Sequence, residues 1–532
     1  MSENRGTRWA VERLTVRLTR RSTLLVSLAL AGYAALEVSV IEAKYPDDAS
    51  RASLLTFGDF PMLRTMQGVP YSTETGALAA WDAGWVISLI VGVWAILTTV
   101  RTLRGDESDG RAEVVLAGPV RASRLLARQA VTLLALCVGV GLATGLALVA
   151  AGTPASGALL FGATIGAVGA AFVGLATLTS QIFASRSQAA GASAGLLGAA
   201  LVLRMTANSA DSRTWLAWFT PFGWSDHLQP FGDNHAFALA VPAVVVAGLV
   251  GCAIALRVRR DSGTGLVPER NVRPSRAWGL TSPLAFAWRA NLGTLATWAV
   301  ALAGWSVATG ALLPTMNDFV AADPSFRDVL AGMGMNVADL SLGYIVMTTT
   351  VVGVALSIYA ATRIGAARTE EATTRLDHVA TRSVLRRRWL AGHVLLTLAS
   401  VIVLALVAGF STWAGAAVMG SDLTLSDSMA AVLNTVPVAV VFGGLAVLVF
   451  GLAPRATVAV AASGAAVAYL LPIIGPALSW PDAVMGASPF WHLGAVPIEA
   501  FDLTAAVALV AIGAAAAVVG TIAFERRDLV GA

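Results

Sequence analysis

An apolar run from Ala83 to Val100 (AGWVISLIVGVWAILTTV) leads directly into a charged segment from Arg101 to Glu113 (RTLRGDESDGRAE). The first stretch is long enough to cross the hydrocarbon core of a bilayer as a helix. The second stretch spaces acidic and basic residues three or four positions apart, as on one face of a short helix. The pattern predicts a membrane-spanning helix that continues into a charged segment outside the bilayer.

Similar apolar stretches recur along the chain and predict further spans of the same kind. The expected spans lie near 22–42, 83–100, 130–151, 157–180, 188–206, 236–256, 291–313, 342–361, 394–418, 429–453, 456–474 and 502–524. The chain is 56% hydrophobic and 13% charged, whereas a soluble domain is about 25% charged. This composition excludes a soluble protein and predicts an all-α polytopic membrane protein with about twelve transmembrane helices.

The loops on alternate sides of these spans differ strongly in positive charge. One side receives 30 of the 36 Lys and Arg residues, and the positive-inside rule makes that side, with both termini, cytoplasmic. The basic residues form short clusters between apolar spans, which argues against nucleic acid as a partner. Lys44 is the one lysine, and this preference for Arg is typical of a GC-rich bacterial genome. We therefore expect a bacterial plasma membrane, with the lipid bilayer as surroundings.

Three sequence elements occur twice, in the same order and at offsets of about 264 to 268 residues, as an internal repeat would require. Arg104, Glu107, Arg111 and Glu113 align with Arg368, Glu371, Arg375 and Asp377; Thr220-Pro221-Phe222-Gly223-Trp224 aligns with Ser488-Pro489-Phe490-Trp491; Arg259-Arg260-Asp261 aligns with Arg526-Arg527-Asp528. Because each repeat holds an even number of spans, both enter the membrane from the same side. The prediction is a fused pseudo-dimer of two parallel six-helix repeats.

This duplication gives a domain organisation with four parts. We expect a cytoplasmic amphipathic connecting helix at 1–21, a first half at 22–256, a cytoplasmic linker with a second connecting helix at 257–289, and a second half at 290–532. In the first part, Val11, Leu14 and Leu18 share one helical face and arginines share another, as in a helix that lies in the membrane interface. A merely basic flank is the alternative. Ser282 before Pro283 predicts the start of the second connecting helix.

The charged segments after the second span of each half are the most specific feature of the sequence. A solvated loop that obeys the positive-inside rule is the simple interpretation. That rule asks only for positive charge, yet both halves repeat the order Arg, Glu, Arg, acid. The repetition favours a docking role for the eight aligned residues.

The outer segments 208–235 and 476–500 are broken by prolines and rich in tryptophan. An interfacial aromatic belt accounts for the tryptophans, whereas re-entrant hairpins account for the prolines as well. We favour hairpins built around two duplicated groups, Pro221, Phe222 and Trp224 with Pro489, Phe490 and Trp491.

Sequence motifs for catalysis on this chain are missing. A phosphate loop needs Lys followed by Ser or Thr, but Lys44 is followed by Tyr45. The five histidines lack metal-ligand spacing, so we expect no metal, no cofactor and no enzymatic activity. Glu37 is the clearest carboxylate within a span, and it leaves open a proton-coupled secondary transporter. The acidic pair Asp47-Asp48 has no second cluster, which makes an integral-membrane transferase the weaker alternative.

Several of these motifs resemble the membrane subunit of ABC-2 type exporters. They are Glu107-x-x-Gly110-Arg111-x-Glu113-x-x-Leu116-Ala117-x-Pro119-Val120, the Thr/Ser-Pro-Phe element, and Phe524-x-Arg526-Arg527-Asp528. The fused halves are similar to the polyketide-antibiotic (tetronasin-type) exporter permeases of actinobacteria. The resemblance implies two copies of a soluble ABC ATPase as partners, which hold ATP and Mg. It also implies coupling helices at about 105–118 and 369–382, the second departing from the pattern at Thr374, Arg382 and Ser383.

The resemblance further implies that the second and fifth spans of each half line a transport cavity. The candidate pathway residues are Trp85, Trp94, Met205, Tyr344, Met347, Tyr359 and Tyr469. These spans offer aromatic and methionine side chains but few charges, which suits a hydrophobic or amphipathic small molecule as cargo. Each candidate could equally face lipid or the protein core.

Overall fold

The computed structural model describes residues 9–529 apart from 59, 119, 262–263, 268–281, 323–339, 373–375, 377–384 and 478. In these residues the regular structure is helical, with an isolated bridge between Phe183 and Val267. Twelve of the described helices are long and apolar enough to cross a membrane. Each overlaps one expected span, so the prediction of an all-α polytopic membrane protein is confirmed.

The chain divides into two compact units, Met1–Arg273 and Pro274–Ala532. The division falls inside the segment 257–289 that the sequence marks as a linker. Each unit holds six of the twelve candidate spans.

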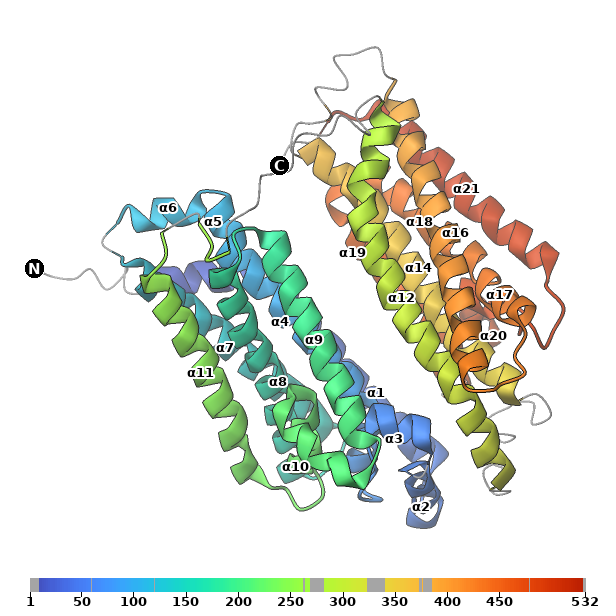
Figure 1. Cartoon of the computed structure of the whole chain (residues 1–532), viewed down its shortest axis with the longest axis horizontal. Coiled ribbons are helices and arrows are strands. Elements are labelled where there is room, and N and C mark those ends of the chain that lie inside the picture. Colours follow the sequence, from blue (N-terminus) through green and yellow to red (C-terminus); the bar gives the residue numbers. More distant parts are fainter. Residues whose placement is uncertain are drawn as a thin grey trace, which may run out of the picture. The chain divides into compact units, whose positions relative to one another are not determined.

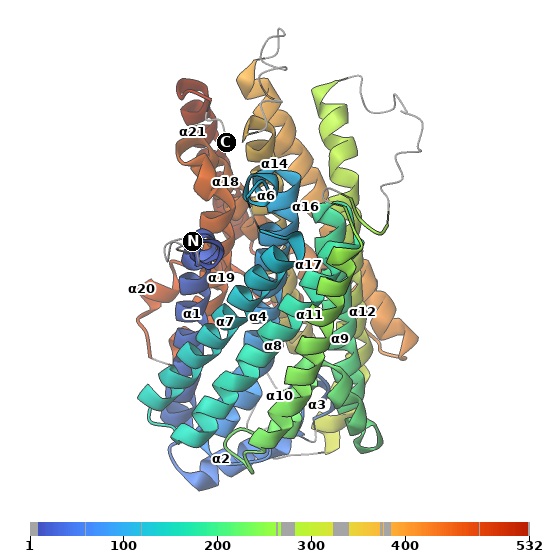
Figure 2. The ribbon, with the colours of Figure 1, turned by 90° about the vertical axis from the view of Figure 1, so that its left-hand side faces the viewer.

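The first unit is a bundle of six long helices with short helices at both ends (Figures 1 and 2). The long helices are α1 (Ala10–Lys44), α4 (Thr75–Val100), α7 (Ala122–Ala150), α8 (Ala155–Ile182), α9 (Arg186–Asn208) and α11 (Ala240–Val258). The short elements are α2 (Asp48–Leu55), η1 (Thr56–Gly58), α3 (Pro61–Gln67), η2 (Arg101–Gly105), α5 (Asp106–Ser108), α6 (Arg111–Leu116), η3 (Asp211–Phe219), η4 (Pro221–Gly223), α10 (Trp224–Leu228) and η5 (Ala236–Leu239).

The second unit has the same order of spans with one interruption. Its helices are α12 (Pro283–Ala322), α14 (Leu340–Ala372), α16 (Arg386–Val418), α17 (Leu425–Leu433), α18 (Val436–Leu452), η7 (Pro454–Ala456), α19 (Thr457–Ala477), α20 (Asp482–Met485), η8 (Pro489–His492) and α21 (Leu503–Arg526). Here the fourth span is split into α17 and α18. Pro437 lies at the start of α18 and lacks the N–H that would continue the helix, and Asn434 in the break donates its side-chain amide to the Gly494 carbonyl at 2.9 Å.

The helices pack in the same pattern within each unit. In the first unit α1 packs on α7, and α8 packs on both α4 and α11; in the second unit α12 packs on α16, and α18 packs on both α14 and α21. The first span thus contacts the third, and the fourth contacts the second and the sixth, in both cases. This repeated packing supports the duplication inferred from the sequence.

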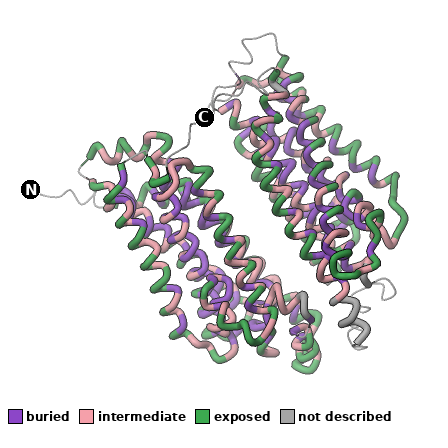
Figure 3. Tube along the Cα trace, in the orientation of Figure 1, coloured by how far each residue is buried: buried purple, intermediate pink, exposed green. Residues whose placement is uncertain are grey.

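Close packing in both units depends on glycines. Figure 3 shows buried residues along the inner faces of the helices and exposed residues along the outer faces. A Cβ atom added to Gly141 of α7 would lie 2.2 Å from the Gly162 carbonyl oxygen of α8, and one added to Gly444 of α18 would lie 2.0 Å from the Gly513 carbonyl oxygen of α21. Lipid gives no hydrophobic drive for association between helices, so small residues that permit backbone contact supply van der Waals attraction instead.

The N-terminal helix is continuous through the expected boundary at residue 21. Figure 2 shows its first turns end-on beside the N label, while the rest of α1 runs along the bundle. Hydroxyl groups of Thr15, Thr19 and Thr23 donate to carbonyls four residues earlier, at 2.8 to 3.1 Å. Such side-chain bonds bend helices. Glu12 pairs with Arg128 of α7 at 2.8 Å and holds the first turns to the bundle.

The first long helix of the second unit, α12, begins where the sequence predicts. α12 starts at Pro283, and the Ser282 hydroxyl accepts the backbone N–H of Ala285 at 3.1 Å, as in an N-cap. It continues without a break into the first span of the second half, as α1 does in the first. In both halves the segment expected to be a connecting helix and the first span therefore form one continuous helix.

We predict that Gly141→Val lowers the thermal stability of the purified chain, because the new side chain forces α7 away from α8. Overpacking of this kind costs about 1 to 3 kcal/mol. The matched control is Gly139→Val on the same helix, where nothing lies within 4 Å of an added Cβ. Equal melting temperatures for the two variants in detergent would contradict the close contact.

Candidate functional site at the ends of the second spans

The second span of the first half continues beyond the apolar stretch. After α4 comes a π-helical turn, η2, followed without interruption by α5. The chain then turns at Gly110, whose φ of +73° suits a residue without Cβ, and α6 begins at Arg111. The expectation of one coupling helix over 105–118 is therefore wrong, because the segment consists of two short helices with a glycine turn between them.

Glu107 lies in a buried cluster of arginines. Its Oε2 accepts from Arg104 Nη1 at 2.6 Å and from Arg260 Nη2 at 2.7 Å, and its Oε1 accepts from Arg260 Nη2 at 2.9 Å. Arg257 of α11 lies 4.0 Å away. The side chains of Arg104 and Glu107 are only 1% and 9% exposed. Their side chains lie inside the bundle and not on its surface, and the ATPase-coupling role of Arg104 and Glu107 stays a prediction.

The second half repeats this arrangement at the aligned residues. Glu371, near the end of α14, accepts from Arg527 Nη1 at 2.5 Å and from Arg527 Nη2 at 2.9 Å, while Arg368 lies 3.8 Å away. The Arg527 guanidinium also covers the rings of Phe450 and Phe524, 5.2 and 5.1 Å from their centroids. Glu371 is 1% exposed. Its side chain is likewise inside the bundle, and its ATPase-coupling role stays a prediction.

We call these two groups the carboxylate clamps, Glu107 with Arg260 and Glu371 with Arg527. Each joins the end of a second span to the end of the sixth span of the same half. A buried charge without a partner is strongly unfavourable, and a two-bond arginine–carboxylate contact is among the strongest ways to satisfy it. The duplicated motif with Glu107 or Glu371 therefore contacts the duplicated motif with Arg260 or Arg527 in the same half.

Arg111 and Glu113 lie on the exposed part of the segment. Arg111 pairs with Asp106 at 2.9 Å and Asp109 at 2.7 Å, and Glu113 is exposed. Val114 beside it is 78% exposed, which is unusual for a valine outside lipid. Figure 1 shows α6 projecting across the end of the first bundle. Of the predicted docking residues in this half, these two remain available.

The matching segment of the second half is described only in part. Residues 369–372 belong to α14. Arg375 and Asp377 lie outside the described residues, so the second coupling segment at 369–382 stays a prediction. Arg368, at 14% side-chain exposure, belongs with the clamp.

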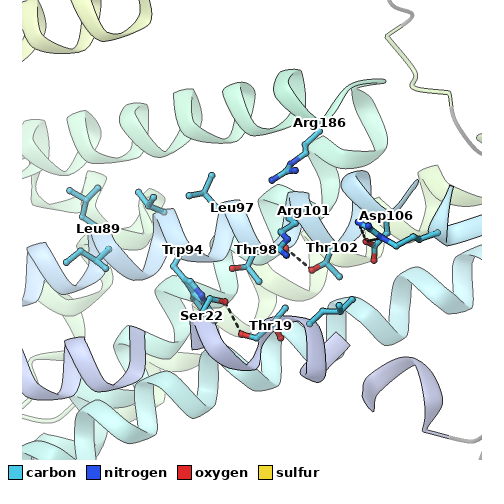
Figure 4. A pocket seen from close by; sticks show the side chains of 14 residues that line it. Thr19, Ser22, Leu89, Trp94, Leu97, Thr98, Arg101, Thr102, Asp106 and Arg186 are labelled. Carbon is cyan, nitrogen blue, oxygen red and sulfur yellow. Dashed lines mark hydrogen bonds and ion pairs between the residues drawn. The ribbon is translucent and has the colours of Figure 1, made fainter. Parts of the chain in front are cut away.

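A cavity of about 740 Å³ opens beside α4, next to this segment (Figure 4). Its apolar wall comes mainly from α4, and its polar end from η2, α5, α6 and the first residue of α9. The lining residues are Leu18, Thr19, Ser22, Leu89, Ile90, Val93, Trp94, Leu97, Thr98, Arg101, Thr102, Asp106, Arg111 and Arg186. Trp94 is thus placed in a cavity, as the pathway prediction requires.

The other pathway candidates do not line this cavity. Tyr344 is buried and donates to the Thr309 carbonyl at 3.3 Å. Tyr359 is fully buried and donates to Asn291 Oδ1 at 3.1 Å, so both tyrosines are core residues. Met347 is 58% exposed.

The remaining three candidates are Trp85, Met205 and Tyr469, and all are half-buried. Tyr469 packs edge-on against Phe490 at 5.9 Å. Sequence reasoning does not single out Arg101 and Arg186, because the positive-inside rule accounts for both as orienting charges. Their signal was their position, at the end of a second span and at the start of a fifth.

The duplicated Pro-Phe elements enter the bundles. Thr220 Oγ1 donates to the Ala200 carbonyl of α9 at 2.7 Å, and Ser488 Oγ donates to the Ala468 carbonyl of α19 at 2.5 Å. Thr220 and Ser488, and likewise Ala200 and Ala468, are 268 residues apart, so the two halves repeat the same contact. Each outer segment is thereby fastened to the fifth span of its own half.

The first outer segment also reaches deep along a span. Phe222 packs on Phe172 of α8 with ring centroids 5.4 Å apart. Phe172 lies about 25 Å along α8 from Ala155 at 1.5 Å per residue. Contacts at that depth favour a re-entrant segment over a surface belt. Trp224 is 2% exposed in this segment, whereas Trp491 of the second is 42% exposed, so the two hairpins differ.

A histidine in the first outer segment is held neutral. His227 stacks on Trp218 with ring centroids 3.9 Å apart. Burial lowers the pKa of His227 from its ordinary value, although Asp226 opposes this shift. The stack contributes to the packing of η3 against α10.

Glu37 of α1, the carboxylate singled out within a span, is half-buried, and Asp82 of α4 is among the charges near it. Gln67 Nε2 donates to Asp82 Oδ1 at 3.0 Å.

We predict that Arg260→Met lowers stability far more than Arg259→Met. Removal of one partner from a buried ion pair costs about 3 to 5 kcal/mol, whereas Arg259 is exposed. Thermal unfolding in detergent measures the difference. Glu107→Leu should cost at least as much as Arg260→Met, because it leaves both Arg104 and Arg260 without their buried carboxylate; equal melting temperatures for Arg260→Met and Arg259→Met would contradict the clamp.

Comparison with known proteins agrees with this architecture. The family model described as "Multidrug efflux system permease Rv1217c, C-terminal domain" matches residues 12–256 and 280–525, which are the two halves. The multidrug efflux system permease protein Rv1217c of Mycobacterium tuberculosis (strain ATCC 25618 / H37Rv) is 30% identical over 521 residues, covering 95% of this chain and 91% of the relative. The chain therefore belongs to the family of the multidrug efflux system permease Rv1217c.

Proposed function

We propose that this chain is the permease subunit of an ATP-driven exporter of hydrophobic or amphipathic small molecules. In this proposal two copies of a separate soluble ABC ATPase bind ATP and Mg, and the chain lies in a bacterial plasma membrane with both termini in the cytoplasm. The observation that carries it is α6, an exposed helix with Glu113 and Val114 on its surface, at the end of a second span. The relative's role in multidrug efflux supports the cargo class.

The same geometry suggests how force would reach the membrane. A partner that displaces α6 acts through the Gly110 turn on α5, η2 and α4. The clamp at Glu107 and Arg260 makes the end of α11 move with the end of α4. The cavity at Trp94 lies along α4, so displacement of this helix changes its shape.

The likeness to tetronasin-type permeases belongs to the same proposal. It rests on the fusion of two six-helix units in one chain. Unequal coupling segments also belong here, since Gly110 allows the turn before α6 and Thr374 stands at the aligned position.

A proton-coupled transporter is the second candidate, and the placement of Glu37 of α1 near Asp82 of α4 favours it. Carboxyl pairs within membrane spans are typical of proton relays. The two candidates differ in their energy source, which makes them separable.

We predict that Val114→Glu abolishes co-purification with the proposed soluble ATPase partner. The added charge removes an apolar contact from an exposed helix, and interface anchors of this kind contribute about 2 kcal/mol or more. The control is Val267→Glu, an exposed valine at 45% on the segment that follows α11. If Val114→Glu retained the ATPase as the unmodified chain does, α6 would not be the docking element.

We predict that cells expressing the chain with its ATPase accumulate less of a hydrophobic dye than cells with the chain alone. In reconstituted vesicles, dye movement should require ATP and persist after the proton gradient is dissipated. Movement driven by a proton gradient without ATP, and lost on Glu37→Gln, would support the second candidate instead.

A further inference from the structure

The side chains of two arginines that line the cavity beside α4 form no hydrogen bond or ion pair with the described protein. Arg101 extends from the end of α4 and Arg186 from the start of α9, both toward the same space (Figure 4). Among the described residues neither side chain makes an ion pair or hydrogen bond, although the charge of Arg101 acts on Asp106 of the same cavity. Arg111, by contrast, is paired with Asp106 and Asp109. The cavity therefore carries an excess of positive charge at one end.

The rest of the cavity is apolar and open. Ile90, Val93 and Leu97 lie on one face of α4 and are 42%, 41% and 56% exposed. Most of α4 is otherwise buried in the bundle. Apolar side chains thus form a wall that leads away from the two arginines.

Trp94 in this wall offers a hydrogen bond that the protein does not use. Its side chain is 8% exposed, and its indole N–H has no acceptor in the described structure. A buried donor without a partner is costly. A ligand with an oxygen at this point would satisfy it.

The backbone geometry also distinguishes this end of α4. Arg101 begins the π-helical turn η2, a rare conformation that occurs often at functional sites. Arg101 faces the cavity, whereas Arg104 in the same turn is buried in the clamp. The turn η2 therefore supplies one arginine to the open cavity and another to the buried clamp.

The second half has no such charge at the corresponding position. Gly365 aligns with Arg101 at the offset of 264. A Cβ atom added there would lie 2.3 Å from Val458 Cγ2, so a larger side chain does not fit without displacement. A charge that only oriented the chain in the membrane could stand at this position in either half. The arginine stands only in the first half, where Arg101 lines the cavity.

We propose that this cavity binds an anionic amphiphile of drug size, an apolar body that carries one carboxylate, sulfonate or phosphate group. The acid group lies between Arg101 and Arg186, because guanidinium groups pair with planar oxyanions. The body lies along the α4 wall, and an oxygen accepts from Trp94 Nε1. The volume of about 740 Å³ is within the roughly 300 to 1,000 Å³ typical of small-molecule sites. This inference rests on the proposed function and narrows its cargo to acids.

The test compares an acid with its neutral ester. The full chain is reconstituted in phosphatidylcholine nanodiscs, and binding of 11-(dansylamino)undecanoic acid or its methyl ester is followed by energy transfer from tryptophan. Empty discs give the background. We expect the acid to bind about tenfold or more tightly than the ester, the ratio that one charge-assisted contact supplies.

Variants locate the effect. Arg101→Gln with Arg186→Gln should reduce the preference for the acid to about twofold or less, while Arg259→Gln, which removes an exposed arginine outside the cavity, should leave it unchanged. Trp94→Phe should weaken acid and ester alike. Melting temperatures close to that of the unmodified chain show that the variants fold.

Three results would overturn the proposal. They are equal binding of acid and ester by the unmodified chain, an acid preference that survives the double arginine variant, and loss of acid binding when part of the phosphatidylcholine is replaced by phosphatidylglycerol. The last result would assign the arginines to a lipid headgroup. The assay uses neither ATPase nor ATP, so its failure is distinguishable from failure of ATP-driven export.

Discussion

A carboxylate buried among arginines closes each six-helix unit at one end. Within a bilayer, helices associate through contact between small residues, and this contact resists sliding only weakly. The clamps add a directional, two-bond connection between the second and sixth spans. Because the charges are buried, neither partner can leave without a large free-energy cost. The positions of η2, α5 and α6, and hence the shape of the cavity, follow from this connection.

The clamp and the outer hairpin hold opposite ends of the same bundle. At one end Glu107 binds Arg260, and at the other Thr220 hydrogen-bonds to the Ala200 carbonyl of α9. Between them, contacts such as Gly141 against Gly162 let the backbones touch. The polar contacts therefore fix register while the glycines fix distance. The middle of the bundle needs no polar contacts for specificity, which leaves its surface apolar for lipid and cargo.

The sequence predicts the features that depend on length and composition. The twelve spans and the helix start at Ser282 are confirmed because apolar stretches and caps act locally. The burial of Glu107 and Glu371 could not be predicted, because spacing shows that charges share a helical face but not whether that face meets solvent or another helix. The burial of Tyr359 could not be predicted either, since its partner Asn291 lies on a different span.

The cavity shows a different limit of prediction. Arg101 and Arg186 are far apart in sequence, and the positive-inside rule accounts for each without reference to the other. Their convergence depends on α9 lying beside α4. Only the fold brings this pair together, although each member is recognisable in the sequence as an arginine at the end of an apolar span.

The difference between Arg101 and Gly365 has a consequence for how such a chain can evolve. Two identical subunits encoded by one gene must carry every substitution twice, so a change that improves one copy is imposed on the other. Once both copies are joined in one polypeptide, the duplicated contacts can be retained while one copy acquires arginines and the other keeps a glycine packed by Val458. Fusion also places one unit of each kind in every molecule, so two different subunits need not find each other during assembly. The single chain therefore holds two unequal units in a one-to-one ratio that translation fixes.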